Sequence, residues 1–308
     1  MSPRTRSART RLLLPATALT LLLALTATTP TTSTGANPGT RPGPTAGPAA
    51  APSQVPSMIA AENDKPTTRA GKAVRKPGTH QRRSVLILAK NDEGKFRPSC
   101  TGSMVADRLV LTAGHCTDNG TMKLVPAAHR PKGSKTFKRP YGTCTVRAVS
   151  FDMQGEDGWT SRNDYALLST GSCTKGPKNR KRTRYVGRLT GAWPVLETSN
   201  GWWDEGDNAM FTAGYPGDKP KGTMWSTKHV TIDNFQDHSG IATNELAGGA
   251  SGSPMVAKDS NGVSSIVAIA RAVYSPGEAG TGKTGGVQCL RMTEEVQEKL
   301  REWASIMQ

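Results

Sequence analysis

Short apolar runs separated by turn-forming residues characterise the chain from residue 84 onward. They lie at 85–89, 104–111, 144–151, 165–168, 209–213, 224–232, 254–257 and 265–274. Runs of this length, broken by glycine, proline, asparagine and aspartate, are typical of strands in β-barrels and β-sandwiches. The pattern therefore predicts an all-β fold.

A change of period near the carboxyl terminus predicts one helix, from about residue 294 to 303. Thr293 is suited to cap its N-terminus, and two glutamates follow in the first turn. Val296, Leu300 and Trp303 share one face. We expect this helix to pack that face across the β-structure and close it.

Residues 1–27 have the three regions of a secretory signal. Several arginines precede an apolar run at 12–25, and small residues follow it. A membrane anchor is disfavoured because the run is short and is interrupted by Pro15, Thr17 and Thr20. We expect a secreted, extracellular protein with no membrane contact once the signal is removed.

Residues 28–83 are rich in proline, threonine, alanine and glycine and contain few large apolar residues. Such a segment buries too little surface to offset the entropy of ordering, so it is predicted to be a flexible pro-segment or linker. It ends at Arg82-Arg83. This pair indicates proteolytic maturation of a zymogen before Ser84, with two exposed arginines at a domain edge as the alternative.

The formal net charge is +16, and the densest basic run lies at 178–184. It lacks the interleaved aromatic residues and the motifs of nucleic-acid binding. A solvated basic loop is therefore the favoured interpretation, and no nucleic-acid partner is expected. For an exported protein, contact with an anionic cell wall stays open.

Five cysteines are present, and export makes disulfides plausible. A bridge between Cys100 and Cys116 would fix the strand pair that leads to His115. None of the cysteine spacings has the close form of a zinc site, and the five histidines do not cluster as ligands. We therefore expect no cofactor and no catalytic metal.

The stretch from Gly248 to Pro254, with the sequence GGASGSP, places Ser251 among small residues that leave its hydroxyl and nearby amides accessible. A serine hydroxyl becomes a nucleophile only with an adjacent base, a group that orients the base, and donors for the developing oxyanion. Glycine and serine also fill ordinary turns, so the stretch alone does not decide its function.

Two upstream blocks supply the missing groups. An apolar strand runs into Thr112-Ala113-Gly114-His115-Cys116 and delivers His115 as a candidate base. Asp164, in Asn163-Asp164-Tyr165-Ala166-Leu167-Leu168, stands at the entrance of a buried strand and is the candidate group that orients His115. An asparagine–aspartate pair before a strand is also common in plain turns.

These three blocks, in this order, resemble the signature blocks of chymotrypsin-like (trypsin-fold) serine endopeptidases. The order His, Asp, Ser differs from the subtilisin and α/β-hydrolase orders. The resemblance covers 84–308 and implies two six-stranded antiparallel β-barrels, about 84–190 and 191–308. It places His115 and Asp164 on the first barrel and Ser251 on the second, with an oxyanion hole formed by the N–H groups of Gly249 and Ser251.

Within that family the chain is most similar to bacterial glutamyl-endopeptidase-like enzymes. Ala250 stands where animal digestive members carry the aspartate that pairs with the new amino terminus. Ala270 and Arg271 lie in the pocket strand, which lacks the histidine of glutamate-specific members. Glu245 lies at the offset of the acid that binds basic substrate side chains in trypsin-like members, which favours Arg or Lys. Arg271 could instead neutralise Glu245 or attract acidic residues.

The pairing of the remaining cysteines is less determined. A Cys144–Cys173 bridge would brace the segment that carries Asp164 and leave Cys289 free.

Another motif, at 277–284, fits the phosphate-binding pattern Gly-x4-Gly-Lys-Thr. Two glycines follow in place of a helix, so a flexible loop near the pocket mouth is favoured over nucleotide binding.

The prediction is a secreted serine endopeptidase that acts on protein or peptide substrates as a monomer. The alternative is a secreted binding protein that keeps the protease fold without catalysis.

Overall fold

The computed structural model describes residues 59–60, 74–77, 82–117, 120–154, 163–174, 176–178, 182–198, 210–230, 232–236, 239–242, 249–258, 262–274 and 286–307. The predicted signal segment, Glu245 and the phosphate-loop-like stretch lie outside these ranges. Within them, no helix combines the length and apolar character that a membrane crossing requires.

The first six strands after residue 83 form a closed antiparallel barrel. In barrel order they are β3 (Ser84–Lys90), β4 (Phe96–Met104), β5 (Leu109–Thr112), β8 (Asn163–Cys173), β7 (Cys144–Gln154) and β6 (Met122–Pro126). Alternating apolar side chains fill its interior, among them Val85, Ile87, Leu124 and Leu168, all with no exposed surface. The first predicted barrel is confirmed.

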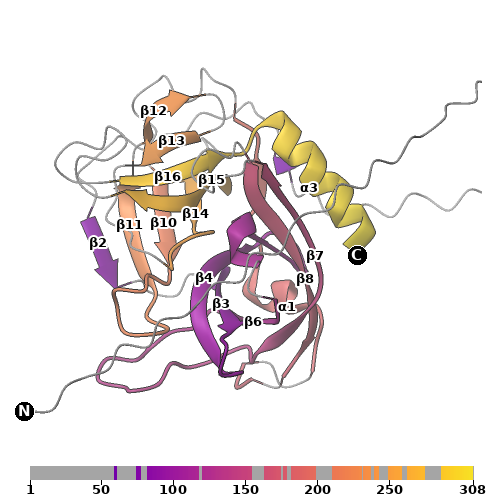
Figure 1. The fold of residues 1–308 in the computed structure, drawn as a ribbon, viewed down its shortest axis with the longest axis vertical. Coiled ribbons are helices and arrows are strands. Elements are labelled where there is room, and N and C mark those ends of the chain that lie inside the picture. The colour runs from indigo at the N-terminus through magenta and orange to yellow at the C-terminus, as the bar shows by residue number, and fades with distance from the viewer. Residues whose placement is uncertain are drawn as a thin grey trace, which may run out of the picture. The chain divides into compact units, whose positions relative to one another are not determined.

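The second group of strands follows the path β12-β13-β16-β15-β14-β10-β11. The bounds are β10 (Met210–Gly214), β11 (Trp225–Val230), β12 (Ile232–Gln236), β13 (Ser239–Ala242), β14 (Pro254–Lys258), β15 (Ser264–Tyr274) and β16 (Gly286–Arg291). Only residue 231 separates β11 from β12, so the two ends of the path are adjoining parts of one chain segment. This second antiparallel sheet, which β1, β2 and β9 extend, occupies the place of the second predicted barrel (Figure 1).

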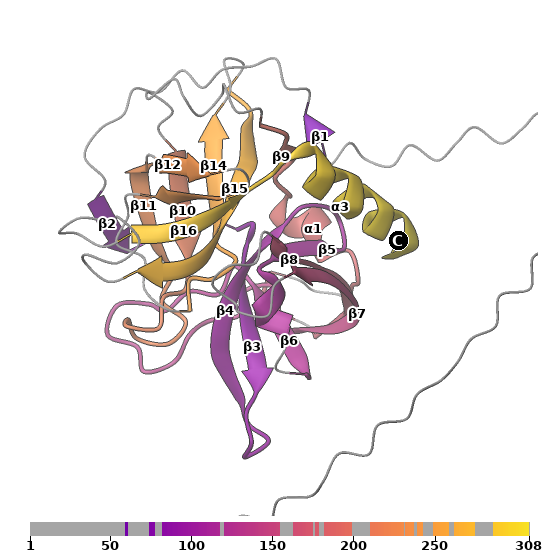
Figure 2. The ribbon, with the colours of Figure 1, turned by 45° about the horizontal axis from the view of Figure 1, so that its top comes forward.

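Two short strands precede the first barrel, within the segment predicted to be a flexible pro-segment or linker. β1 (Ile59–Ala60) pairs in parallel with β9 (Val195–Leu196), and β2 (Val74–Pro77) pairs antiparallel with β11. Figure 2 shows β1 beside β9 and β2 beside β11. Backbone hydrogen bonds to an existing sheet order these two stretches of a segment that has little apolar surface of its own. The role of the segment as a pro-segment or linker stays a prediction.

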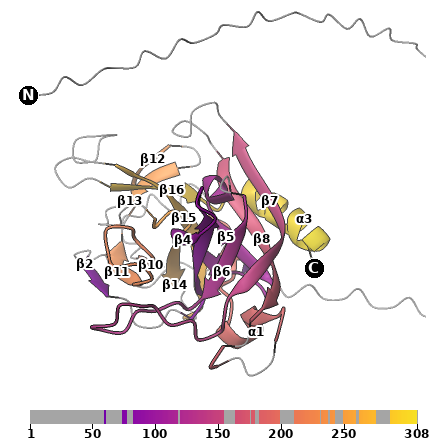
Figure 3. The same cartoon turned by 60° about the horizontal axis from the view of Figure 1, so that its bottom comes forward.

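The carboxyl-terminal helix α3 (Glu294–Met307) is confirmed and extends four residues beyond its predicted end. The Val296 N–H donates to the Thr293 hydroxyl at 3.4 Å, so Thr293 caps the helix as expected. Val296 and Leu300 share one core with Leu109 of the first barrel and Val256 of the second. α3 thus closes the β-structure, running beside β7 and β8 (Figure 3).

The structure corrects one strand prediction that bears on the site. Residues 104–111 are not one strand: β4 ends at Met104, and the Val105 N–H bonds to the Leu109 carbonyl at 2.9 Å, which closes a turn before β5. Most of β4, all of β6, β13 and β16, and the short helix α1 (Val186–Thr190) were not predicted. β4 has a proline, a cysteine and several small polar residues in place of an alternating apolar pattern.

Candidate active site

His115 lies just after strand β5, in the one-turn 3-10 helix η1 (Gly114–Thr117). The buried strand brings the chain to the interface between the barrels, and the turn leaves the imidazole partly exposed, at 37% of its side-chain surface. The Cys100–Cys116 disulfide ties this turn to β4. The predicted bridge is confirmed, and so is Cys144–Cys173, with Cys289 buried as a free thiol.

Asp164 is the second residue of β8, and its side chain is only 3% exposed. It meets His115 through both carboxylate oxygens. The His115 backbone N–H donates to Oδ1 at 2.8 Å, and the ring Nδ1 lies 2.8 Å from Oδ2. Two contacts of this length fix the ring orientation and favour a proton on Nδ1, which leaves Nε2 as the basic atom.

Burial and partners act in opposite directions on the Asp164 carboxyl. Burial alone would raise its pKa, but the hydrogen bonds and charge of His115, together with the charge of Arg271, outweigh burial and lower the pKa of Asp164. The carboxylate is therefore ionised at neutral pH.

Ser251 lies in a tight turn immediately before β14 of the second barrel. Gly249 and Gly252 flank it with φ of 86° and 79°, values that glycine adopts without strain. A Cβ on Gly252 would lie 2.1 Å from the Thr101 carbonyl oxygen and 2.3 Å from the Thr112 hydroxyl. Glycine at this position lets the serine turn approach the first barrel.

Thr101 of β4 holds the serine turn from the first barrel. Its N–H donates to the Ser251 carbonyl at 2.9 Å, and its hydroxyl lies 3.2 Å from the Gly249 carbonyl as a donor. The same hydroxyl accepts the Tyr215 N–H at 2.9 Å. Thr101 is fully buried. Thr101 was not predicted as part of the site, because these partners lie more than a hundred positions away in the sequence.

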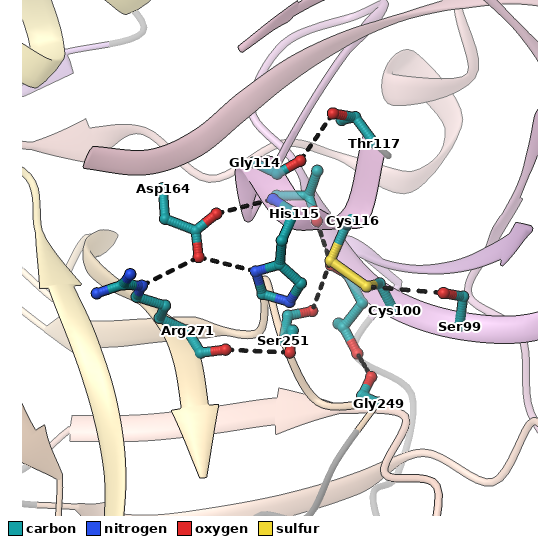
Figure 4. Close-up of a disulfide and its surroundings, with 12 residues drawn as sticks. Ser99, Cys100, Gly114, His115, Cys116, Thr117, Asp164, Gly249, Ser251 and Arg271 are labelled. Carbon is teal, nitrogen blue, oxygen red and sulfur yellow. Dashed lines mark hydrogen bonds and ion pairs between the residues drawn. A yellow bond between two sulfur atoms is a disulfide. The ribbon is translucent and has the colours of Figure 1, made fainter. Parts of the chain in front are cut away.

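The Ser251 hydroxyl donates to the Arg271 carbonyl at 3.1 Å. Figure 4 shows His115 and Ser251 beside one another, with Asp164 on the far side of the imidazole. Within the described part of the chain, the N–H groups of Gly249 and Ser251 have no hydrogen-bond acceptor. Two unused donors beside a serine hydroxyl are the arrangement that an oxyanion requires.

Arg271 approaches Asp164 from the second barrel. Its side chain is 2% exposed, and Nε donates to Asp164 Oδ2 at 3.2 Å, the same oxygen that faces His115 Nδ1 (Figure 4). A terminal nitrogen donates to Gln288 Oε1 at 3.3 Å. Arg271 was predicted to lie in the pocket strand, but its ion pair with Asp164 was not predicted. Contact between this side chain and a substrate stays a prediction.

Ala270 is buried next to the serine turn, where its carbonyl accepts the Gly252 N–H at 2.7 Å and its N–H donates to the Ser253 carbonyl at 2.8 Å. Its role in lining a substrate pocket stays a prediction, as does that of Glu245.

One group of metal-ligand types occurs among the described residues: Cys100, His115 and Cys116. The two sulfurs are bonded to each other, and the imidazole is held by Asp164. Disulfide sulfurs are not the thiolates that bind zinc, so this group does not fit a metal site.

Comparison with known proteins finds similarity to proteases. The trypsin family profile matches residues 74–186, which include His115 and Asp164. Over these residues the chain is similar to the chymotrypsin-like (trypsin-fold) serine proteases. It is also similar to a glutamyl endopeptidase.

The chain is similar to two relatives from Bacillus species. It is 27% identical over 224 residues to a glutamyl endopeptidase of Bacillus licheniformis. The aligned region covers 68% of this chain and 61% of the relative. The chain is 28% identical over 232 residues to an extracellular metalloprotease of Bacillus subtilis, with 73% and 64% covered. The chain thus spans a little over three fifths of the length of each relative.

Two solved structures share the fold of this chain. A Glu endopeptidase in complex with MPD has a TM-score of 0.53 at 19% identity, covering 77% of this chain and 99% of that one. The protease Anisep from Arthrobacter nicotinovorans has a TM-score of 0.52 at 18% identity, covering 73% and 96%.

Proposed function

We propose that this protein is a secreted serine endopeptidase that cleaves peptide bonds through Ser251, His115 and Asp164. The observation that carries the proposal is the double contact between His115 and Asp164 beside a serine turn with two unused N–H donors. The similarity to the trypsin family and to a glutamyl endopeptidase supports the reaction class. The apolar run near the amino terminus supports export.

In the proposed reaction, the Ser251 hydroxyl turns from the Arg271 carbonyl toward His115 Nε2. The imidazole takes the hydroxyl proton while Oγ bonds to the carbonyl carbon of the substrate. Asp164 stabilises the imidazolium, and the Gly249 and Ser251 N–H groups stabilise the oxyanion. The C–N bond then breaks as His115 returns the proton to the leaving amine, and water releases the acyl group by the same steps.

The alternative function is peptide binding without catalysis, on an intact protease fold. The observation in its favour is that the Ser251 hydroxyl bonds to the Arg271 carbonyl in the structure. Rotation about the Ser251 Cα–Cβ bond can release this contact without a change in the backbone, so we favour the enzyme.

For the substrate side chain that is recognised, we propose a basic residue held by Glu245. Glutamate-specific members of the family carry a histidine in the pocket strand, and the matching strand here, which includes Ala270, has none. The absence of that imidazole supports a preference for basic residues over glutamate. Buried carboxylates bind Arg and Lys through charge-assisted hydrogen bonds.

The experiment for both proposals is a peptide-library profile of the wild-type protein and its S251A and E245Q variants. We expect cleavage after Arg and Lys by the wild type and a loss of several orders of magnitude in S251A. Unchanged cleavage in S251A would refute the mechanism. A wild-type preference for Glu, or an unchanged preference in E245Q, would refute the role of Glu245 alone.

We also propose that the first barrel contacts an anionic polymer of the cell envelope. No aspartate or glutamate occurs at 119–151 or at 165–196. The Cys144–Cys173 disulfide and the bond from the Lys178 N–H to the Pro140 carbonyl, at 2.9 Å, bring these two segments together. Among the described residues of these segments, the exposed basic ones are Lys132, Lys135, Lys138, Arg139, Arg147, Lys178, Arg182, Arg184 and Arg188.

Retention on immobilised polyphosphate tests this contact. We expect a K132S/K135S/K138S variant to elute at lower salt than the wild type, because each lost cation removes an ionic contact. A K228S/K258S/R301S variant removes the same charge from the second barrel and α3, and should elute close to the wild type. If the two variants eluted at the same salt concentration, binding would depend on net charge alone, and the proposed contact through the first barrel would be refuted.

A further inference from the structure

Arg271 is the most informative residue outside the three predicted catalytic groups. The register between β15 and β16 shifts at this point: Ala270 lies opposite Cys289, and Ala272 lies opposite Gln288. Arg271 is therefore the extra residue of a β-bulge. Bulges redirect side chains and are enriched next to active sites. Here the bulge aims a buried arginine out of its own barrel and toward the first.

The contacts of Arg271 join the nucleophile to the acid. Its carbonyl oxygen accepts the Ser251 hydroxyl at 3.1 Å, and its Nε donates to Asp164 Oδ2 at 3.2 Å. Asp164 Oδ2 is shared with His115 Nδ1. One residue of the second barrel thus contacts two of the three candidate catalytic groups and faces the third across a single oxygen atom.

The charges around the imidazole follow from these contacts. Among the described residues, the charged side chains that contact the pair formed by His115 and Asp164 are Asp164 itself, from β8, and Arg271, from β15. The neighbouring acid is Asp152 on β7. It accepts the Asn163 amide at 3.3 Å and is paired with Lys299 of α3.

We propose that Arg271 is a positioning residue that fixes the Asp164 carboxylate across the interface of the barrels and sets the pH at which His115 takes up a proton. The inference rests on the catalytic roles proposed above for His115 and Asp164. Protonated His115 would be a second cation in contact with the Asp164 carboxylate, which is already paired with the Arg271 guanidinium. The buried guanidinium therefore opposes protonation and keeps His115 in its basic form at lower pH than the acid alone would.

The test compares full-length wild type with R271M, which removes the charge and keeps a flexible apolar side chain. The His115 ring is titrated by NMR, a readout that does not depend on peptidase activity. We expect the midpoint in R271M to lie about one pH unit higher than in the wild type. R188M, which breaks the exposed Arg188–Asp107 pair, is the matched control and should titrate like the wild type.

Further variants separate charge from folding. R271K keeps the charge and should retain the wild-type midpoint. R271Q should behave like R271M, and it replaces R271M if thermal melting shows that R271M is unfolded. An R271M or R271Q midpoint equal to or below that of the wild type would overturn the proposal.

The same proteins are then assayed for peptide hydrolysis against pH. We expect the acid limb of kcat/KM to move upward with the NMR midpoint in R271M, and kcat to fall roughly tenfold with little change in KM. A wild-type protein without activity would refute the proposed function. The NMR titration would still test the effect of Arg271 on the protonation of His115. An active R271M with the wild-type acid limb would overturn the role of Arg271 alone.

Discussion

His115 contacts both oxygens of Asp164, one through its backbone N–H and one through its ring Nδ1, each at 2.8 Å. The backbone contact holds the carboxylate in place even when the ring changes its protonation. The ring contact then determines which imidazole nitrogen faces Ser251. Asp164 therefore influences both the orientation and the tautomer of the His115 ring.

Asp164→Asn keeps the size of the side chain but replaces one oxygen with an amide that cannot accept the Nδ1 proton. We expect kcat for peptide hydrolysis to fall by about three to four orders of magnitude, because the ring loses its productive tautomer. Steady-state kinetics on a peptide substrate measures the change. Asp107→Asn, in an exposed ion pair, is the control and should keep wild-type kcat. A D164N enzyme within tenfold of the wild type would show that the acid is dispensable.

The lowered pKa of Asp164 predicts how stability changes with pH. The unfolded chain binds this proton more tightly than the folded protein does, so the stabilisation is complete well above the ordinary carboxyl value of about 3.9. It is lost as the pH falls through that value toward the lower folded pKa. Thermal melting of wild type and D164N at pH 6, 4 and 3 measures it. We expect the difference in Tm to narrow with acid, and a constant difference would contradict the assignment.

Gly252→Ala places a methyl group against the carbonyl of Thr101, at a φ of 79°. The strained backbone and the clash together should lower stability by about 2 to 5 kcal/mol and displace Ser251 from the first barrel. Urea unfolding and peptide hydrolysis measure both effects. Gly133→Ala is the matched control, because φ is 76° and nothing lies within 4 Å of the added carbon. It should cost about 1 to 2 kcal/mol and leave activity intact.

The sequence was sufficient to single out His115, Asp164 and Ser251, because each stands in a local block with its own strand or turn signal. Their catalytic roles stay predictions. Helix α3 was equally accessible through its cap and apolar face. Arg271 was only partly predicted: its strand was expected, but a bulge that redirects one side chain leaves no periodic signal. Thr101 was missed for a related reason, since its strand contains proline and small polar residues and its function depends on contacts between barrels.

The Arg83–Ser84 bond was the predicted maturation site, but the structure builds both residues into the first barrel. The Arg83 carbonyl accepts the Met104 N–H at 2.8 Å, and its guanidinium stacks over Trp193 at 5.6 Å. Ser84 has no exposed surface. A cut at this bond would place a charged amino group on Ser84, which is itself buried.

A chain that begins at Ser84 should therefore be less stable than one that begins at Lys72, by about 2 kcal/mol or more. Urea unfolding measures the difference. A chain that begins at Arg82 keeps the stacking on Trp193 but lacks β2, so it separates the two contributions. Equal stability of all three chains would show that the segment before Ser84 adds nothing to the folded domain.

The central claim is that Ser251 is an activated nucleophile, and covalent labelling with a fluorophosphonate tests it most directly. The serine oxygen displaces fluoride and bonds to phosphorus, which requires the base and the oxyanion donors to act together. Peptide mapping by mass spectrometry locates the adduct. We predict one adduct, on Ser251, in the native wild type, and none in S251A or in heat-denatured protein. A native wild type without an adduct, or with an adduct at another residue, would contradict the account.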